Sequence, residues 1–182
     1  MKAAVINDEQ GFDVVAVPDP APGPEEIVLA LTACGICGSD LKAVHTLPVG
    51  TVMGHEFCGE IVAVGRDVTG VWRTGQRVTA LPVIGCGSCV ACLIGDVAHC
   101  AAADLIGIGG SSGAFAQHVR VSGREAFAVP ELPTDDAAAL VEPLAVGLHA
   151  VNAARLEPGA RVAVVGVGPV GLAVVSWARL LG

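Results

Sequence analysis

The sequence of 182 residues has few basic and few aromatic side chains. Ten Lys and Arg stand against eighteen Asp and Glu, the formal net charge is -8, and no block of basic residues occurs. We therefore expect no nucleic-acid partner and no anionic lipid surface. With four Phe, two Trp and no Tyr, the chain also lacks aromatic platforms on which bases could stack.

The sequence has little that indicates secretion or membrane insertion. Its N-terminus, MKAAVINDEQ, has no long apolar core followed by a small-residue cleavage site. The most apolar run, residues 162–178, is just short of a membrane span and contains three glycines and a proline. We therefore expect a cytoplasmic protein with no membrane partner, in which thiols stay reduced.

Cysteines are few but clustered. Of the seven, four lie in GCGSCVACLIGDVAHC with the spacing C-x2-C-x2-C-x7-C. In a reducing compartment such clustering favours a metal over disulfides. Four thiolates complete the tetrahedral shell of zinc and leave no open position, so Cys86, Cys89, Cys92 and Cys100 predict a structural zinc ion. Free buried thiols or a redox pair are the alternatives.

Up to residue 130 the chain has the pattern of short β-strands separated by Gly and Pro. The expected strands are 1–6, 12–17, 25–33, 60–65, 76–83 and 115–121. Many short strands with frequent turns favour a barrel-like, mainly β domain.

The second part of the chain has a different pattern. Thr134, followed by two aspartates, predicts a helix start, and Pro143 is expected to interrupt or kink the run that follows. Residues 161–182 then suggest a strand, a glycine turn and a helix. We predict a β domain over residues 1–152 and the start of an α/β domain over residues 153–182.

The glycine turn has the pattern G-x-G-x-x-G between an apolar strand and an apolar helix, which is typical of dinucleotide-binding domains. In that interpretation Gly166 permits the tight turn, Gly168 lets a pyrophosphate approach, and Gly171 allows close helix packing. A glycine-rich core or membrane helix is the alternative. The acidic residue that distinguishes NAD from NADP is expected about twenty residues further on, beyond Gly182.

Several motifs occur together in a known order. CGICGSD at 34–40, GHEFCGE at 54–60, the cysteine-rich loop, EPLAVGLHAV at 142–151 and VGVGPVG at 165–171 make the chain resemble the zinc-dependent medium-chain alcohol, polyol and threonine dehydrogenases. The resemblance covers essentially the whole chain. It implies a chaperonin-10-like (GroES-like) catalytic β domain, followed by the first β-α unit of a truncated Rossmann domain.

By spacing alone, Cys37 and His55 are a weak pair. The resemblance implies that they hold a catalytic zinc with an open position for substrate. It also implies that Asp40 orients the histidine, which suits a metal-bound imidazole. Ser39 would receive the proton of the substrate alcohol, and Glu56 would lie near the metal and ligate it transiently.

The third zinc ligand is less strongly indicated. Glu142 in VEPLAVGLHAV resembles the glutamate at or near the metal in the polyol and threonine dehydrogenase branch. An acid at a helix N-terminus is the alternative interpretation. Lys42 stands where many relatives have a proton-relaying histidine, so the route beyond Ser39 stays open among Lys42, His45, the cofactor ribose and water.

Together these features predict hydride transfer from a small alcohol or polyol to NAD or NADP, with two zinc ions per chain. The resemblance implies a homo-oligomer for the complete protein, and we expect the 182-residue chain alone to be inactive. One alternative is a catalytically silent zinc-binding scaffold. Another is the zinc-free quinone reductase branch of the same fold, which is expected to lack the cysteine-rich loop.

Overall fold

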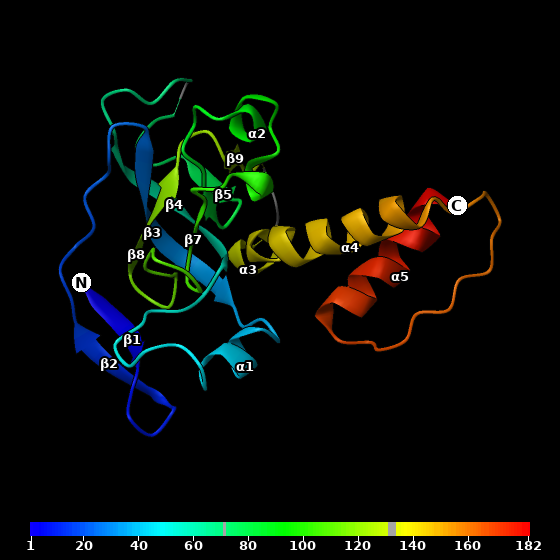
Figure 1. Ribbon diagram of the computed structural model, residues 1–182, viewed down its shortest axis with the longest axis horizontal. Helices are drawn as coiled ribbons and strands as arrows, with labels where there is room; N and C mark the ends of the chain where they lie inside the picture. Colours follow the sequence, from blue (N-terminus) through cyan, green and yellow to red (C-terminus); the bar gives the residue numbers. More distant parts are fainter. Residues whose placement is uncertain (71, 131–133) are drawn as a thin grey trace. The chain divides into compact units, whose positions relative to one another are not determined.

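A computed structural model describes residues 1–70, 72–130 and 134–182. The chain forms two compact units, Met1–Ala139 and Leu140–Gly182. All strands of the described residues belong to the first unit, and the second contains two helices (Figure 1). The predicted boundary between residues 152 and 153 concerns the domains of the complete protein and stays a prediction.

A five-stranded antiparallel sheet with the order β8-β3-β4-β5-β9 organises the first unit. Its strands are β3 (Glu26–Gly35), β4 (Glu56–Val64), β5 (Arg77–Ala80), β8 (His118–Ser122) and β9 (Ala126–Ala128). Two smaller sheets pair β1 (Lys2–Ile6) with β2 (Phe12–Ala16), and β6 (Val83–Ile84) with β7 (Asp104–Leu105). The strands β7 and β9 were not predicted, because elements of two or three residues are too short to show alternation.

Four short helical segments join or flank these strands. They are α1 (Asp40–Ala43), α2 (Val90–Leu93), the 3-10 helix η1 (Val97–His99) and α3 (Asp135–Ala139). The segments α2 and η1 lie between β6 and β7, within the cysteine-rich loop. The β-rich character that the sequence predicts for this part of the chain is confirmed.

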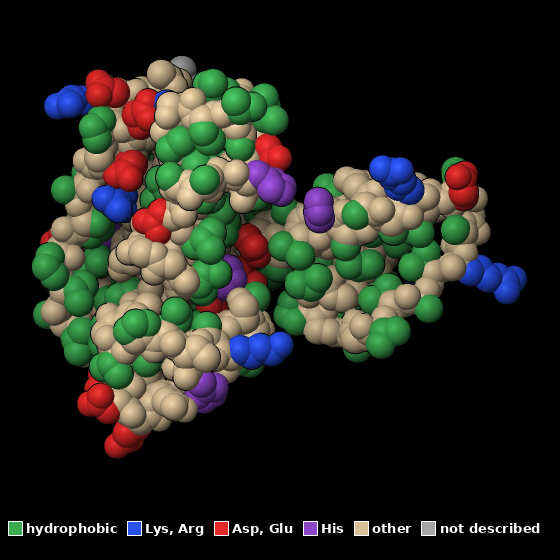
Figure 2. Space-filling model, in the orientation of Figure 1, with side chains coloured by type: hydrophobic (Ala, Val, Ile, Leu, Met, Phe, Trp, Pro, Cys, Tyr) green, Lys and Arg blue, Asp and Glu red, His purple; other side chains and the backbone are tan. Residues whose placement is uncertain are grey.

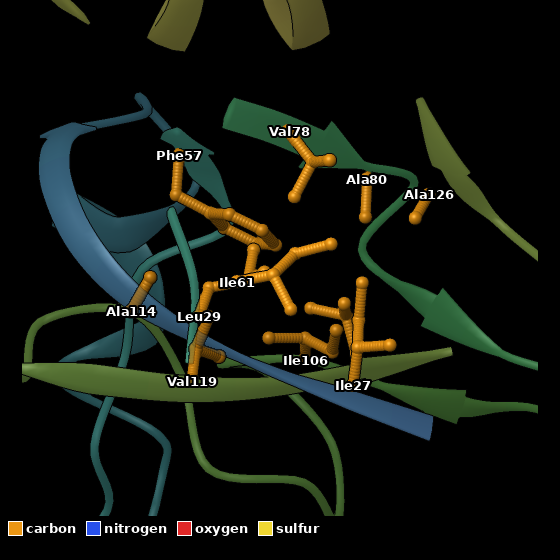
Figure 3. Close-up of a cluster of buried hydrophobic side chains, with 11 residues drawn as sticks. Ile27, Leu29, Phe57, Ile61, Val78, Ala80, Ile106, Ala114, Val119 and Ala126 are labelled. Carbon is orange, nitrogen blue, oxygen red and sulfur yellow. The ribbon is translucent and has the colours of Figure 1, made fainter. Parts of the chain in front are cut away.

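The core lies against the central sheet, where alternate residues of each strand face the same side. Figure 3 shows side chains of β3, β4, β5 and β8 pointing toward one another. The fully buried members include Ile27, Leu29, Phe57, Ile61, Val78, Val119 and Val121. This packing fixes the register of β3 and β4, whose ends carry the candidate metal ligands.

Ile61→Ala is expected to destabilise the protein by about 2–5 kcal/mol, because it removes buried methylene groups and leaves a cavity. Ile61 is 0% exposed and sits in the centre of the core cluster. The matched control is Val62→Ala on the same strand, whose side chain points to the opposite face and is 43% exposed. Chemical denaturation of both variants checks this, and equal losses would contradict the assignment of the core.

The helix α3 is fixed to the sheet by a cap, an ion pair and apolar contacts. The Thr134 hydroxyl oxygen accepts the N–H of Ala137 at 3.2 Å, which confirms the predicted helix start. Asp135 forms an ion pair with Arg77 of β5 at 2.8 Å. The end of α3 packs on Cys58 of β4, and burial raises the pKa of this thiol. Cys58 is therefore a core residue.

The second unit consists of α4 (Val141–Ala154) and α5 (Pro169–Leu181). The two helices approach closely where Gly147 faces Ala173, since a Cβ on Gly147 would lie 2.6 Å from the Ala173 Cβ. The indole N–H of Trp177 donates to the Leu144 carbonyl oxygen at 2.8 Å. A small residue and a directed hydrogen bond thus hold the pair together.

Two local predictions for this unit are corrected. Pro143 does not interrupt the helix: the break falls at Leu140, and Pro143 lies in the first turn of α4, where its missing N–H costs no helical bond. Residues 161–165 form no strand, because no strand among the described residues pairs with them. Many apolar side chains of this segment and of α5 are instead exposed, among them Val165 and Leu180. Figure 2 shows hydrophobic side chains, in green, on the surface of the molecule.

One stretch, Asp135–Ala154, is long and apolar enough to cross a membrane by length and composition alone. This is weak evidence, because core helices of water-soluble proteins pass the same test. The stretch also includes the break at Leu140 and the acidic residues at its start. The absence of a membrane partner stays a prediction.

Candidate metal sites

The cysteine-rich loop brings its four predicted ligands together. The sulfur atoms of Cys86, Cys89, Cys92 and Cys100 all lie within 4.8 Å of one another, with 4.0 Å between Cys86 and Cys92. Tetrahedral zinc with Zn–S bonds of about 2.3 Å would place sulfurs roughly 3.8 Å apart, whereas a disulfide requires about 2.05 Å. All four cysteines are free thiols. The cluster fits a metal ion and does not fit disulfides.

Two thiols of this loop have pKa values shifted in opposite directions. The backbone N–H of Ser88, its hydroxyl and the N–H of Cys89 lower the pKa of Cys86 to about 6. Burial and the neighbouring thiols raise the pKa of Cys92 to about 12. A metal ion binds thiolates, so Cys86 loses its proton to a metal more readily than Cys92 does. Gly85 keeps the loop tight, since a Cβ there would lie 2.8 Å from the Cys92 sulfur.

The second cluster joins Cys37, His55 and Glu56, whose ligand atoms lie within 4.8 Å of one another. Cys37 follows β3, and Glu56 begins β4 directly after His55. Because β3 and β4 pair antiparallel with Gly35 opposite Glu56, the sheet itself brings these side chains together. His55 and Glu56 are buried, and one sulfur, one nitrogen and one oxygen form a donor set that zinc accepts.

Asp40 contacts two residues of this cluster, Cys37 and His55. Its carboxylate is 3% exposed, and one oxygen accepts the N–H of Cys37 at 2.8 Å. The other oxygen lies 3.3 Å from Nδ1 of His55, and both of these buried atoms lack an aligned hydrogen bond within the described residues. A proton on Nδ1 would satisfy the carboxylate and leave Nε2 as a ligand. The Ser39 hydroxyl lies 3.4 Å from Nε2.

Two glycines that support this cluster were not singled out from the sequence. A Cβ on Gly35 would lie 2.3 Å from Oε2 of Glu56, so only glycine leaves room for the carboxylate. Gly54 has φ of +98°, and a Cβ there would lie 2.6 Å from the Phe115 ring. The position of Gly54 directly before a predicted ligand was the available signal. Gly35 meets Glu56 only through strand pairing, which no local pattern reveals.

The remaining predicted residues lie in the second unit. Glu142 is in the first turn of α4, and its role as third zinc ligand stays a prediction. Gly166 has φ of +96°, and a Cβ on Gly171 would lie 2.0 Å from the Gly166 carbonyl oxygen. Gly168 caps α5, with Pro169 as its first residue. These conformations match a tight turn and close packing, while cofactor binding by the three glycines stays a prediction.

Three side chains near α1 are not ligands in either cluster. Burial raises the pKa of Cys34 to about 12, aided by the negative charge of Asp40, so this thiol stays protonated. Lys42 is exposed and makes no ion pair within the part of the chain that the structure describes. His45 is exposed, and its Nδ1 lies 2.6 Å from Oε1 of Gln10. These contacts leave the proton route beyond Ser39 open.

A four-thiol cluster and a Cys–His–Glu cluster beside a hydroxyl fit a class of β domain that holds one structural and one reactive metal ion. Residues 23–131 match the family described as the alcohol dehydrogenase GroES-like domain. The chain therefore belongs to this family, within the zinc-dependent medium-chain dehydrogenases/reductases. The predicted resemblance and the GroES-like fold are confirmed.

Relatives and solved structures agree with this assignment. Sorbitol dehydrogenase of Bacillus subtilis (strain 168) is 35% identical over 100% of this chain and 53% of its own length. Galactitol-1-phosphate dehydrogenase of Escherichia coli superposes with a TM-score of 0.89 at 32% identity, covering 100% of this chain and 53% of that one. A protein of Sinorhizobium meliloti 1021, described as a zinc-binding dehydrogenase and solved with NADP, gives 0.87 at 37%, with coverage of 100% and 53%. The chain thus spans about half the length of these relatives.

Proposed function

We propose that the complete protein is a zinc-dependent dehydrogenase that transfers a hydride from a polyol to NAD or NADP. The observation that carries the proposal is the convergence of Cys37, His55 and Glu56, with the Ser39 hydroxyl 3.4 Å from the imidazole Nε2. Relatives named for sorbitol and galactitol 1-phosphate support a polyol as the substrate class.

The residues of the chain have distinct tasks in this reaction. Cys37 and His55 hold the metal, and Asp40 keeps the imidazole oriented and the Cys37 backbone in place. A bound zinc ion supplies Lewis acidity, which lowers the pKa of an alcohol hydroxyl. The Ser39 oxygen would accept the proton that the alcohol loses, and a bound nicotinamide would supply the acceptor for the hydride of the alcohol carbon.

The glycine turn and α5 supply the cofactor part of the proposal. Gly168 is the N-cap of α5, and a Cβ at this position would meet no heavy atom of the described residues within 4 Å. The N-terminus of α5 offers N–H groups to a pyrophosphate. Glu142 is proposed as the third protein ligand, and Glu56, which already lies in the cluster, is the competing candidate. A cytoplasmic location and a homo-oligomeric state belong to the same proposal.

Ser39→Ala in the complete protein is expected to lower kcat for sorbitol about 100-fold or more, because the proton acceptor is removed. The zinc content per chain should stay unchanged, since the hydroxyl is not a ligand. Steady-state reduction of NAD and NADP, with zinc measured by mass spectrometry, checks both statements. Thr46→Ala removes an exposed hydroxyl beyond α1 and is the matched control.

Two outcomes would contradict the proposal. Wild-type turnover by Ser39→Ala would remove the hydroxyl from the mechanism. A complete protein that binds both metals but reduces neither cofactor with any polyol or secondary alcohol would instead be a catalytically silent zinc-binding module.

A further inference from the structure

The backbone that leads into His55 is held by the loop of residues 105–115, which is distant in sequence. The N–H groups of Gly113, Ala114 and Phe115 donate to the carbonyl oxygens of Val52, Gly54 and Met53 at 2.8, 2.9 and 2.7 Å, in that order. Three consecutive donors therefore hold three consecutive carbonyls directly before the imidazole. The backbone at His55 cannot move relative to residues 113–115 without breaking at least one of these hydrogen bonds.

Glycines allow the two segments to pack backbone against backbone. A Cβ on Gly107 would lie 2.5 Å from the Gly54 carbonyl oxygen, and a Cβ on Gly113 would lie 2.3 Å from the Met53 carbonyl oxygen. Gly107 also has φ of +78°, which glycine adopts without strain. The contact is therefore formed by main-chain atoms. No flexible side chain lies between the two segments that could adjust if one of them moved.

The shape of this loop depends on one carboxylate, that of Asp104. One oxygen of Asp104 accepts the N–H of Gly110 at 2.9 Å and the N–H of Ser111 at 3.0 Å. The other oxygen accepts the hydroxyl of Ser111, which is buried. The Ser111 carbonyl in turn accepts the N–H of Gly107 at 3.0 Å. Asp104 thus closes the turn that presents Gly107 to Gly54.

Asp104 also connects this loop to the cysteine-rich loop. It pairs with Ile84 in the β6–β7 ladder, and only Gly85 separates β6 from Cys86. At the other end, the N–H of Ala103 donates to the Cys100 carbonyl oxygen at 3.0 Å. The residue that shapes the loop is therefore fixed at the base of the four-thiol cluster.

We propose that Asp104 is a positioning residue for His55, because its carboxylate shapes the 105–115 loop that holds the Gly54 backbone and ties this loop to the base of the cysteine-rich loop. The inference rests on the proposed function, in which His55 is a metal ligand. Asp104 belongs to neither metal cluster, so its effect on His55 is indirect.

The test compares release of the two metals from the complete protein. In Asp104→Ala, zinc at the Cys37–His55 site should be lost to a chelator about 10-fold faster than in wild type, the low end of effects known for groups that orient a ligand. Zinc in the cysteine-rich loop should be lost at the wild-type rate. A Cys37→Ser variant, measured in parallel, defines the zinc that the four-thiol cluster retains alone. Asp104→Asn, which keeps an acceptor oxygen for both N–H groups, should restore most of the retention.

Glu26→Gln is the matched control, because Glu26 also accepts a backbone N–H, from Gly23 at 2.6 Å, and within the described residues neither of the two bonds to residues 52–55. Hydrogen exchange of the Ala114 and Phe115 amides gives a readout that does not need metal, and it should accelerate in Asp104→Ala only. Unchanged exchange with unchanged zinc release overturns the inference, as does parallel loss of both metals. A wild-type protein with no zinc at Cys37 and His55 would contradict the proposed function, and the amide exchange would still decide the role of Asp104.

Discussion

The double substitution Cys89→Ser, Cys92→Ser is expected to remove one zinc ion per chain and to leave a protein that aggregates. The four sulfurs lie within 4.8 Å of one another, and two hydroxyls cannot replace two thiolates as ligands. Structural zinc contributes roughly 10–16 kcal/mol of apparent binding free energy, which is comparable to the 5–15 kcal/mol stability of a typical domain. Loss of the ion is therefore expected to unfold the domain.

The measurement is zinc per chain together with the thermal unfolding midpoint. The matched control is Val90→Ser, Leu93→Ser, which alters the residues directly after the same two cysteines, at 75% and 72% exposure. The control should keep its zinc and its midpoint, because neither side chain is a ligand or a core residue. Equal zinc and equal midpoints in the cysteine variant and the wild type would show that the cluster is a set of free thiols.

Features that depend on neighbouring residues could be predicted from the sequence. The four-thiol cluster follows from spacing within one loop, and the helix start at Thr134 follows from its capping hydroxyl. The alternation of apolar and polar residues predicted the longer strands, and the structure contains them. The strand expected at residues 161–165 was wrong because a strand needs a partner, and the pattern of one segment does not supply it.

The candidate site could be predicted only in part. The resemblance identified Cys37, His55 and Asp40, and the structure places them together. It did not identify Gly35, which makes room for Glu56 across the β3–β4 pair. Nor did it identify Asp104, whose link to His55 runs through a loop distant in sequence. Contacts between segments far apart in the chain leave no local pattern.

In the complete protein, His55→Ala is expected to lower kcat/KM for a polyol by about 1,000-fold or more. The variant loses a buried imidazole from a cluster of three donors, and Asp40 then faces an empty space. Lewis acid assistance contributes several kcal/mol to the barrier, and each 1.36 kcal/mol changes the rate about tenfold. Zinc in the cysteine-rich loop should remain, so that about one of two ions per chain is lost.

Steady-state kinetics and zinc content are measured on the same preparations. Together they show whether a low turnover rate accompanies the loss of one zinc ion. His99→Ala is the matched control, since His99 is exposed in the cysteine-rich loop and its Nδ1 lies 2.7 Å from Asp96. It should keep both metals and full turnover. Glu142→Ala then tests the third ligand: loss of the same zinc as in His55→Ala assigns the role to Glu142, and retained zinc moves the role to Glu56 or water. Wild-type turnover in His55→Ala would show that the Cys–His–Glu cluster is not the catalytic centre.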